Sequence, residues 1–488
     1  MKISLKVRIG VSFLIILAAM SIIAIPSYAE TIWEKRQKSL QDVQETEKAK
    51  ETVTETDREE TLPSQSASID PFSITIPEQY GTIIDSYKGT NGNLIVHVQD
   101  AHANYEAQKN IVGILESLIR DYNLRLILEE GGSTDASFRY LRIDAPLEAR
   151  VRASEKLLKN AKITGLDYLE LTTDYPLTCQ GIEDKALYNE NRNAIWEMDK
   201  FKGAALEYVN KISTPINSLK EKIYNADLLS MDKAKKDYEN EAMDIVSYYK
   251  TLYGLTQKKN IPIGEFPNFT TLMKIDELEK KFDLIKIRNN TANNEEKAAY
   301  DEYQALLKKL NVNKLFKEEG ILEDRIEEFI AENTDQKNLY KISKAISILD
   351  KMLNVKVVPE EWTYFLENKK DFDPNLWVNF LKEKTSELGT ALDLPSNSYA
   401  ITDNLSKIEK VYITAGERDK VFLRKSGERI KKDGVQIAAL IAGGFHTPTL
   451  TRLLADSDYS YVVISPKVTT PTDDKLYRES LKGEWLPE

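Results

Sequence analysis

The chain contains only three histidines, and two of them lie close to the same apolar run. Residues 94–100 (LIVHVQD) form a predicted strand that includes His97, and His102 lies in the turn that follows. The third, His446, follows the apolar run 436–442 in a second turn. A histidine at a strand end can act as a general base or as a metal ligand, because its charge changes near neutral pH. His102 and His446 are therefore the first candidates for chemistry.

Acidic residues end two further predicted strands. The run 124–130 (LRLILEE) carries Glu129 and Glu130 at its carboxyl end, and the run LTCQGI is followed by Glu183. Adjacent side chains of a strand point to opposite faces, so only one of the first two acids can point at a site shared with His102. We predict that it is Glu129.

These residue types indicate two kinds of chemistry. Two histidines and one or two carboxylates from separate strand ends suit a Zn, Mn or Co site with open positions, in which the metal lowers the pKa of a bound water. The predicted metal ligands are His102, His446, Glu129 and Glu183. Without a metal, a histidine would be the general base for water and Arg418 would stabilise the oxyanion. The candidate catalytic residues are His102, His446, Glu129, Arg418 and Glu106.

A structural role is the alternative for each of these residues. It is our interpretation of His97, which lies in the middle of a predicted strand. Glu130, Asp184 and Asp419 either orient the site residues or cap helices. For His102 and His446, the shared context of strand, turn and helix favours function.

The same pattern predicts the elements that position the site. Asn104 is the predicted N-cap of a helix to about residue 119, and Thr447 is the predicted N-cap of a helix to residue 454, with Pro448 in its first turn. Open α/β sheets bind ligands where strands end and helices begin, because backbone N–H groups and the positive end of the helix dipole converge there. The predicted fold class is α/β, a central sheet with strand-turn-helix active-site motifs interrupted by a large all-helical insertion.

Composition divides the chain into successive regions. Residues 1–29 have the basic, apolar and small-residue pattern of a signal peptide, so we expect an exported protein, periplasmic or extracellular. Residues 30–70 are a predicted disordered charged linker. The first half of the α/β domain is predicted at 71–188, the helical insertion at 189–401 and the second half of the α/β domain at 402–488.

Further elements follow from local patterns. Residues 81–88 are a predicted strand, forming an antiparallel hairpin with the strand that begins at residue 94. Residues 139–171 are predicted to be helical, residues 410–415 (KVYITA) a strand, and residues 459–465 the last strand. We expect the helical insertion to lie over the strand ends as a lid, since both of its junctions emerge near the proposed site.

Composition also limits the partners. The formal net charge is −11 and no basic patch contains interleaved aromatic residues, so nucleic acid is not an expected partner. The single cysteine, Cys179, cannot form an internal disulfide and is predicted to be a small buried side chain. We expect a small-molecule or peptide substrate, and membrane contact only through an uncleaved N-terminal segment. The sequence does not indicate the oligomeric state.

The motifs together resemble a known superfamily. HVQDAHANYEAQ, an LEE strand, QGIED, GERD and GGFH occur in this order. They resemble the superfamily of the Tiki proteases, TraB/PrgY and GumN proteins, erythromycin esterase and the ChaN-like haem-binding proteins. Asp100 stands where ChaN-like members have Glu. The positions that match the family motifs are His102, Glu106, Glu129, Glu183, Arg418 and His446.

The resemblance covers roughly residues 94–184 and 410–465 and implies a function. It implies an exported, metal-assisted hydrolase of a peptide, ester or similar acyl bond. A ChaN-like protein that binds haem or iron is the alternative from another class. Gln99 replaces the glycine of the first family motif, so a catalytically inactive scaffold is the third possibility.

Overall fold

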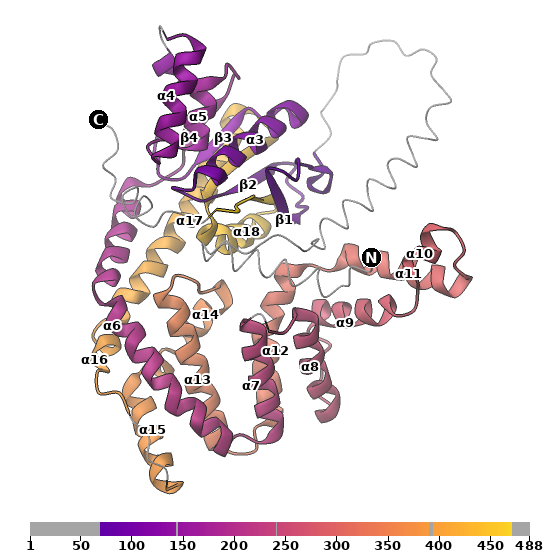
Figure 1. The fold of residues 1–488 in the computed structure, drawn as a ribbon, viewed down its shortest axis with the longest axis vertical. Helices are drawn as coiled ribbons and strands as arrows, with labels where there is room; N and C mark the ends of the chain where they lie inside the picture. Colours follow the sequence, from indigo (N-terminus) through magenta and orange to yellow (C-terminus); the bar gives the residue numbers. More distant parts are fainter. Residues whose placement is uncertain (1–68, 143–144, 241, 390–393, 471–488) are drawn as a thin grey trace. The chain divides into compact units, whose positions relative to one another are not determined.

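The computed structural model describes residues 69–142, 145–240, 242–389 and 394–470 (Figure 1). The predicted signal peptide and most of the charged linker lie outside this part of the chain. The described residues form two compact units, one of residues 198–406 and one that combines the flanking sequences up to 197 and from 407. In the described regions, no helix has both the length and the apolar character needed to cross a membrane.

The second unit contains a six-stranded mixed sheet with the order β1-β6-β2-β5-β3-β4. Strand β1 is antiparallel to β6, and the other neighbours are parallel. The carboxyl ends of β2, β5, β3 and β4 therefore share one edge. The strands are β1 (Gly81–Tyr87), β2 (Leu94–Asp100), β3 (Leu126–Glu129), β4 (Thr178–Gly181), β5 (Ile437–Gly443) and β6 (Ser460–Pro466).

Helices cover both faces of this sheet, which explains why β2 and β5 are continuous apolar runs rather than alternating ones (Figure 1). On one face, Leu128 and Leu440 form a core cluster with Phe422 and Leu450. The other face packs against the helix that follows β2. The helices of this unit are α3 (Tyr105–Tyr122), α4 (Leu147–Lys159), α5 (Gly165–Thr172), α17 (Leu405–Asp433), α18 (Thr447–Asp456), the short η1 (Pro71–Ser73), η2 (Arg139–Arg142) and η4 (Gly444–His446), and the first part of α6 (Lys185–Ile223).

The other unit contains only helices among its described elements. A core of large apolar side chains, Trp377, Phe269 and Phe365 among them, is fully buried there. Its position relative to the strand ends stays a prediction. Besides the rest of α6, its helices are α7 (Ala226–Glu239), α8 (Ile245–Lys259), α9 (Pro267–Glu279), α10 (Leu284–Arg288), α11 (Asn294–Lys309), α12 (Val312–Ile330), α13 (Thr334–Leu353), α14 (Pro359–Glu367), η3 (Lys369–Phe372), α15 (Pro374–Glu387) and α16 (Tyr399–Thr402).

The prediction of a strand at residues 410–415 is wrong, because this segment lies within helix α17. Its β-branched and aromatic residues favour a strand locally. The buried positions of α17 nevertheless follow helical spacing, with Ile408, Val411, Ala415 and Phe422 on the packed face. Tertiary packing of this stripe outweighs the local preference.

Two further local predictions are wrong, and a third holds only in part. Strand β1 pairs with β6, in the register Gly81 to Pro466, and forms no hairpin with β2. The predicted helix over 139–171 is divided into η2, α4 and α5, and a capping box of Thr164 and Asp167 starts the last of these. Thr447 is the first residue of α18 and does not cap it. The predicted N-cap of α3 is confirmed, since the Asn104 side chain accepts a hydrogen bond from the backbone of Ala107.

Candidate functional site

His102 lies in the turn between β2 and α3, at the carboxyl edge of the sheet. Its Nδ1 is 2.7 Å from Oδ2 of Asp100, the last residue of β2. The imidazole is 38% exposed, whereas the Asp100 carboxylate is only 4% exposed. The turn also holds Ala103 at φ 60°, a left-handed conformation that costs an alanine about 1 kcal/mol. A strained turn thus presents a half-exposed histidine on a buried carboxylate.

The Asp100 carboxylate also accepts a hydrogen bond from Gln108 Nε2 of α3, at 2.6 Å. Its charge outweighs burial and raises the pKa of His102 to about 9. No described residue is hydrogen-bonded to Nε2 of His102. At neutral pH the ring is therefore cationic, and above about pH 9 Nε2 becomes a proton acceptor.

Glu129 lies on the same face of the sheet as Asp100. One of its carboxyl oxygens accepts a hydrogen bond from Thr164 Oγ1 at 3.2 Å. Burial, followed by the charges of Asp167 and Asp100, raises its pKa well above the ordinary value of a glutamate. The charge of Glu130 and, to a smaller extent, that of Glu129 also raise the pKa of His102. The protonated form of Glu129 is thus a candidate proton donor beside the His102 pair.

His446 belongs to a second group at the same edge. Its Nδ1 is 2.5 Å from Asp419 Oδ1, and its Nε2 is 3.3 Å from Glu130 Oε1. The side chain is 3% exposed. Burial opposes the charged ring, but Asp419 and Glu130 outweigh it and raise the pKa of His446 to about 10. His446 is therefore a buried imidazolium between two carboxylates.

Arg418 of α17 completes this group. Its guanidinium donates to Glu183 through Nε at 3.1 Å and Nη2 at 2.8 Å, to Glu130 at 2.7 Å and to Asn191 at 2.9 Å. The other oxygen of Glu130 accepts from the backbone N–H of Gly443 at 2.8 Å. Burial opposes the charge of Arg418, but the carboxylates of Glu130 and Glu183 hold the pKa of Arg418 above its ordinary range. One buried cation thus ties together the ends of β3, β4 and β5.

Asp100 and Glu130 lie on opposite faces of the sheet because of strand alternation. Asp100 contacts α3, whereas Glu130 contacts α17. Among the predicted residues, the structure joins Arg418 to Glu183 directly and to His446 through Glu130, and it joins none of them directly to His102. Of the two acids that end β3, Glu130 contacts His446, whereas Glu129 lies on the face of Asp100.

The alternation of side chains along β3 could have shown from the sequence that Glu130 faces α17. Leu126 and Leu128 point into the core cluster that also contains Phe422 of α17. The residue two positions further, Glu130, continues that face towards the same helix.

Glu106 lies in the first turn of α3 but has a different role from the predicted one. Its carboxylate accepts hydrogen bonds from the backbone N–H groups and hydroxyls of Thr469 and Thr470, at 2.7 to 3.0 Å. The side chain of Asn104 donates to the carbonyl of Thr470 at 2.9 Å. Glu106 therefore fixes the chain that leaves β6 to the start of α3.

The four predicted metal ligands do not come together. Arg418 binds both oxygens of Glu183, and two carboxylates flank the two ring nitrogens of His446. Across the described residues, no three or more His, Cys, Asp or Glu side chains are placed to hold a metal ion. This arrangement of the predicted ligands does not fit a metal, and the metal itself stays a prediction for direct analysis.

His97 lies in the sheet core, as its position in the strand suggests. Its Nδ1 is 3.2 Å from the Leu440 carbonyl, its Nε2 is 2.9 Å from Thr447 Oγ1, and burial lowers its pKa to about 4. Gln99, at the position of the family glycine, donates to the same hydroxyl at 2.9 Å. The side-chain oxygen of Gln99, Oε1, is buried and has no hydrogen-bond partner in the described part of the chain. The two side chains hold the start of α18 against β2.

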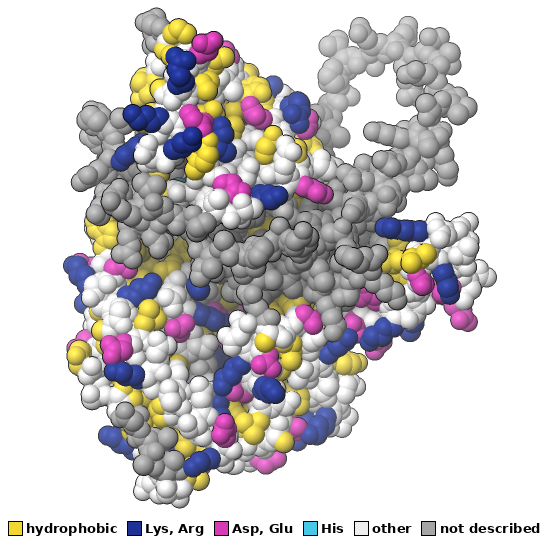
Figure 2. All heavy atoms as spheres, viewed as in Figure 1, with side chains coloured by type: hydrophobic (Ala, Val, Ile, Leu, Met, Phe, Trp, Pro, Cys, Tyr) yellow, Lys and Arg dark blue, Asp and Glu magenta, His cyan; other side chains and the backbone are white. Residues whose placement is uncertain are grey.

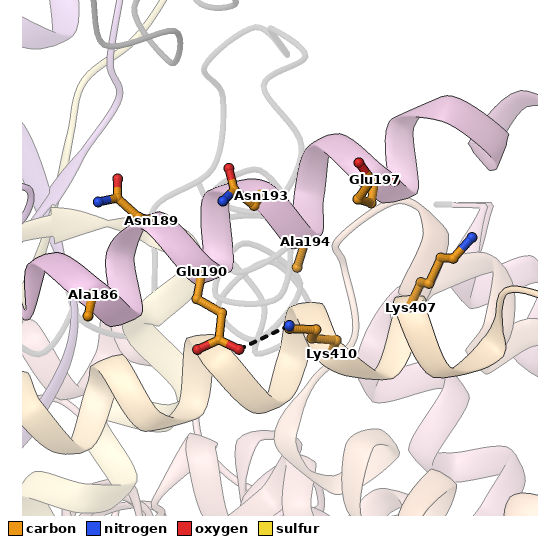
Figure 3. Close-up of a pocket in the computed structure, with 8 residues that line it drawn as sticks. All are labelled: Ala186, Asn189, Glu190, Asn193, Ala194, Glu197, Lys407 and Lys410. Carbon is orange, nitrogen blue, oxygen red and sulfur yellow. Dashed lines mark ion pairs between the residues drawn. The ribbon is translucent and has the colours of Figure 1, made fainter.

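A groove of about 410 Å³ lies between α6 and α17 (Figure 3). An ion pair of 3.0 Å between Lys410 and Glu190 crosses it. None of the predicted site residues lines this groove. Its lining consists of Ala186, Asn189, Glu190, Asn193, Ala194, Glu197, Lys407 and Lys410.

Comparison with known proteins adds no family assignment. Protein-family models, curated proteins and solved structures were compared with the chain, and none of them matches it.

Proposed function

We propose that this chain is an exported hydrolase of the Tiki/TraB/erythromycin esterase type, which cleaves a peptide, ester or similar acyl bond. The observation that supports the proposal best is the half-exposed imidazole of His102 on the buried Asp100 carboxylate. The pair stands at the carboxyl edge of parallel strands, where open α/β sheets hold their ligands. Export is proposed from the pattern of residues 1–29.

The pair can activate water by general-base catalysis. Asp100 holds the Nδ1 proton of the ring, which leaves Nε2 of the neutral ring to accept a proton from water. The hydroxide equivalent attacks the acyl carbon, and the bond to the leaving oxygen or nitrogen breaks. The ring then gives the proton that Nε2 took from water to the leaving group, which restores the neutral imidazole.

The N-terminus of α3 would stabilise the oxyanion that forms when water attacks the acyl carbon. The helix begins three residues after His102, and its positive dipole end favours developing negative charge. Arg418, which the sequence assigned to this task, is 5% exposed and donates to Glu130, Glu183 and Asn191. We assign it instead to holding the strand ends in place.

The first experiment asks whether the protein hydrolyses acyl bonds at all. The chain from Glu30, the predicted mature form, is incubated with panels of fluorogenic esters and peptides. We expect turnover that His102→Ala abolishes, while Arg120→Gln, an exposed change on the same turn-helix unit, has no effect. Absence of turnover on every panel would contradict the proposal.

Metal analysis and an absorption spectrum separate the alternatives. We expect activity to persist after dialysis against a chelator, because His102 and Asp100 can activate water without a metal. Stoichiometric Mn, Zn or Co, lost together with activity, would favour the metal-assisted form. A Soret band in the purified protein would instead favour a haem-binding protein.

A further inference from the structure

An apolar tip projects from the sheet-containing unit at η2 and the start of α4. Tyr140 is 63% exposed, Leu141 47% and Leu147 51%. Large apolar side chains that are exposed singly are common, but three within eight residues form a local group. We call residues 139–142 and 145–147 the α4 tip.

The tip and its helix bury very little. Helix α4 has only Ser154 and Leu158 buried, and η2 has no buried residue. Leu157 on α4 is also 40% exposed. The exposed apolar side chains are therefore not the edge of a larger hydrophobic core.

The surroundings of the tip are basic, although the whole chain is acidic. Residues 139–162 contain seven Lys and Arg against three Asp and Glu, in a chain with a net charge of −11. Arg152, Lys156 and Lys162 are exposed. Figure 2 shows hydrophobic and basic side chains, with some acidic ones among them, over α4. A positive surface in an acidic protein favours an anionic partner.

Hydrogen bonds connect the base of the tip to α5. Arg142 Nε donates to the Glu170 carbonyl at 2.5 Å, and Arg150 donates to the Leu171 carbonyl at 3.0 Å. Glu170, which is fully buried, accepts hydrogen bonds from Ser137 and from the backbone of Phe138. These hydrogen bonds connect η2 and the middle of α4 to α5.

We propose that the α4 tip docks the protein on an anionic lipid surface. Tyrosine is enriched at the interface between headgroups and acyl chains, and the leucines can enter the acyl boundary. The flanking Lys and Arg are attracted by anionic headgroups. A nucleic acid would satisfy the cations but would offer no apolar environment to Leu141 and Leu147. Catalytic activity plays no part in this inference.

The test uses the chain from Glu30 and vesicles of phosphatidylcholine with or without phosphatidylglycerol. We expect binding to the anionic vesicles that weakens strongly in 0.5 M salt, since exposed charges are then screened. Replacing Tyr140, Leu141 and Leu147 together by serine should weaken binding by about tenfold or more. The reason is that each leucine would lose the free energy gained when its side chain moves from water into the lipid. Arg152→Gln with Lys156→Gln should lower it several-fold.

A matched control replaces Leu366 and Leu376 by serine, since these side chains are 43% and 49% exposed in the helical unit. Its binding should equal that of the parent, and circular dichroism should show that every variant is folded. No binding by the parent, equal binding to neutral vesicles, or an equal loss in the control would overturn the proposal. A dimer that the serine variant converts to a monomer, with vesicle binding unchanged, would also overturn it in favour of self-association.

Discussion

Replacing Arg418 by methionine should destabilise the sheet-containing unit strongly. Methionine keeps the unbranched apolar part of the side chain but has no guanidinium, so Glu183 would lose its cation and Glu130 would keep only His446. Glu183 is 1% exposed and cannot be solvated in place of the lost contact. Removing one partner of a buried ion pair costs about 3–5 kcal/mol, and the bidentate geometry places Arg418→Met at the upper end of that range.

The control is Arg424→Met on the same helix. Arg424 is 56% exposed and pairs with Glu428 at 3.0 Å, so its loss should cost about 1 kcal/mol or less. Adding Glu183→Gln to Arg418→Met should restore part of the stability, because it removes the unpaired buried charge.

The assay is urea denaturation followed by hydrogen exchange, read in peptides that cover β3 and β5. The chain has two units, so a single melting temperature would mix their transitions. An effect of Arg418→Met no larger than that of Arg424→Met would refute the structural role assigned to the guanidinium.

Two other predictions concern pH and the helical unit. The pKa of His446 is raised to about 10 in the folded state, so its contribution to stability is complete below about pH 6.5 and is lost as the pH rises through 10. The free energy of unfolding of the sheet unit should therefore fall over this interval, by at most about 5 kcal/mol, and His446→Gln should flatten the profile measured by urea denaturation. Glu323, which is buried and accepts hydrogen bonds from Tyr248 and Lys235, should be essential to the helical unit. Glu323→Leu leaves Lys235 without this partner and should speed hydrogen exchange in α8 and α12, whereas unchanged exchange would show that the pair contributes nothing.

Local patterns predicted much of the sheet edge from sequence. Strand β2, its turn and the N-cap Asn104 follow from an apolar run and a capping residue, which are properties of neighbouring positions. Strand β5 and the turn that carries His446 follow in the same way.

Partners distant in sequence could not be predicted in this way. The pairing of β1 with β6 depends on residues almost 400 positions apart, and the choice of Glu130 depends on which helix covers each face of β3. Arg418 was singled out from its motif, but its contacts with Glu183 and Asn191 arise from the packing of α17 on α6 and β4. Residues 410–415 show the same limit, since their helical state is fixed by what α17 packs against.

The pH dependence of hydrolysis by the parent chain and by His102→Gln tests the central claim most directly. If neutral His102 is the general base, kcat/KM should rise with pH and level off above about 9, where the ring loses its proton. His102→Gln should lower the rate by roughly 10²- to 10⁴-fold and remove this inflection. A variant that keeps the rate and the inflection of the parent would contradict the assignment of His102 and its pair with Asp100.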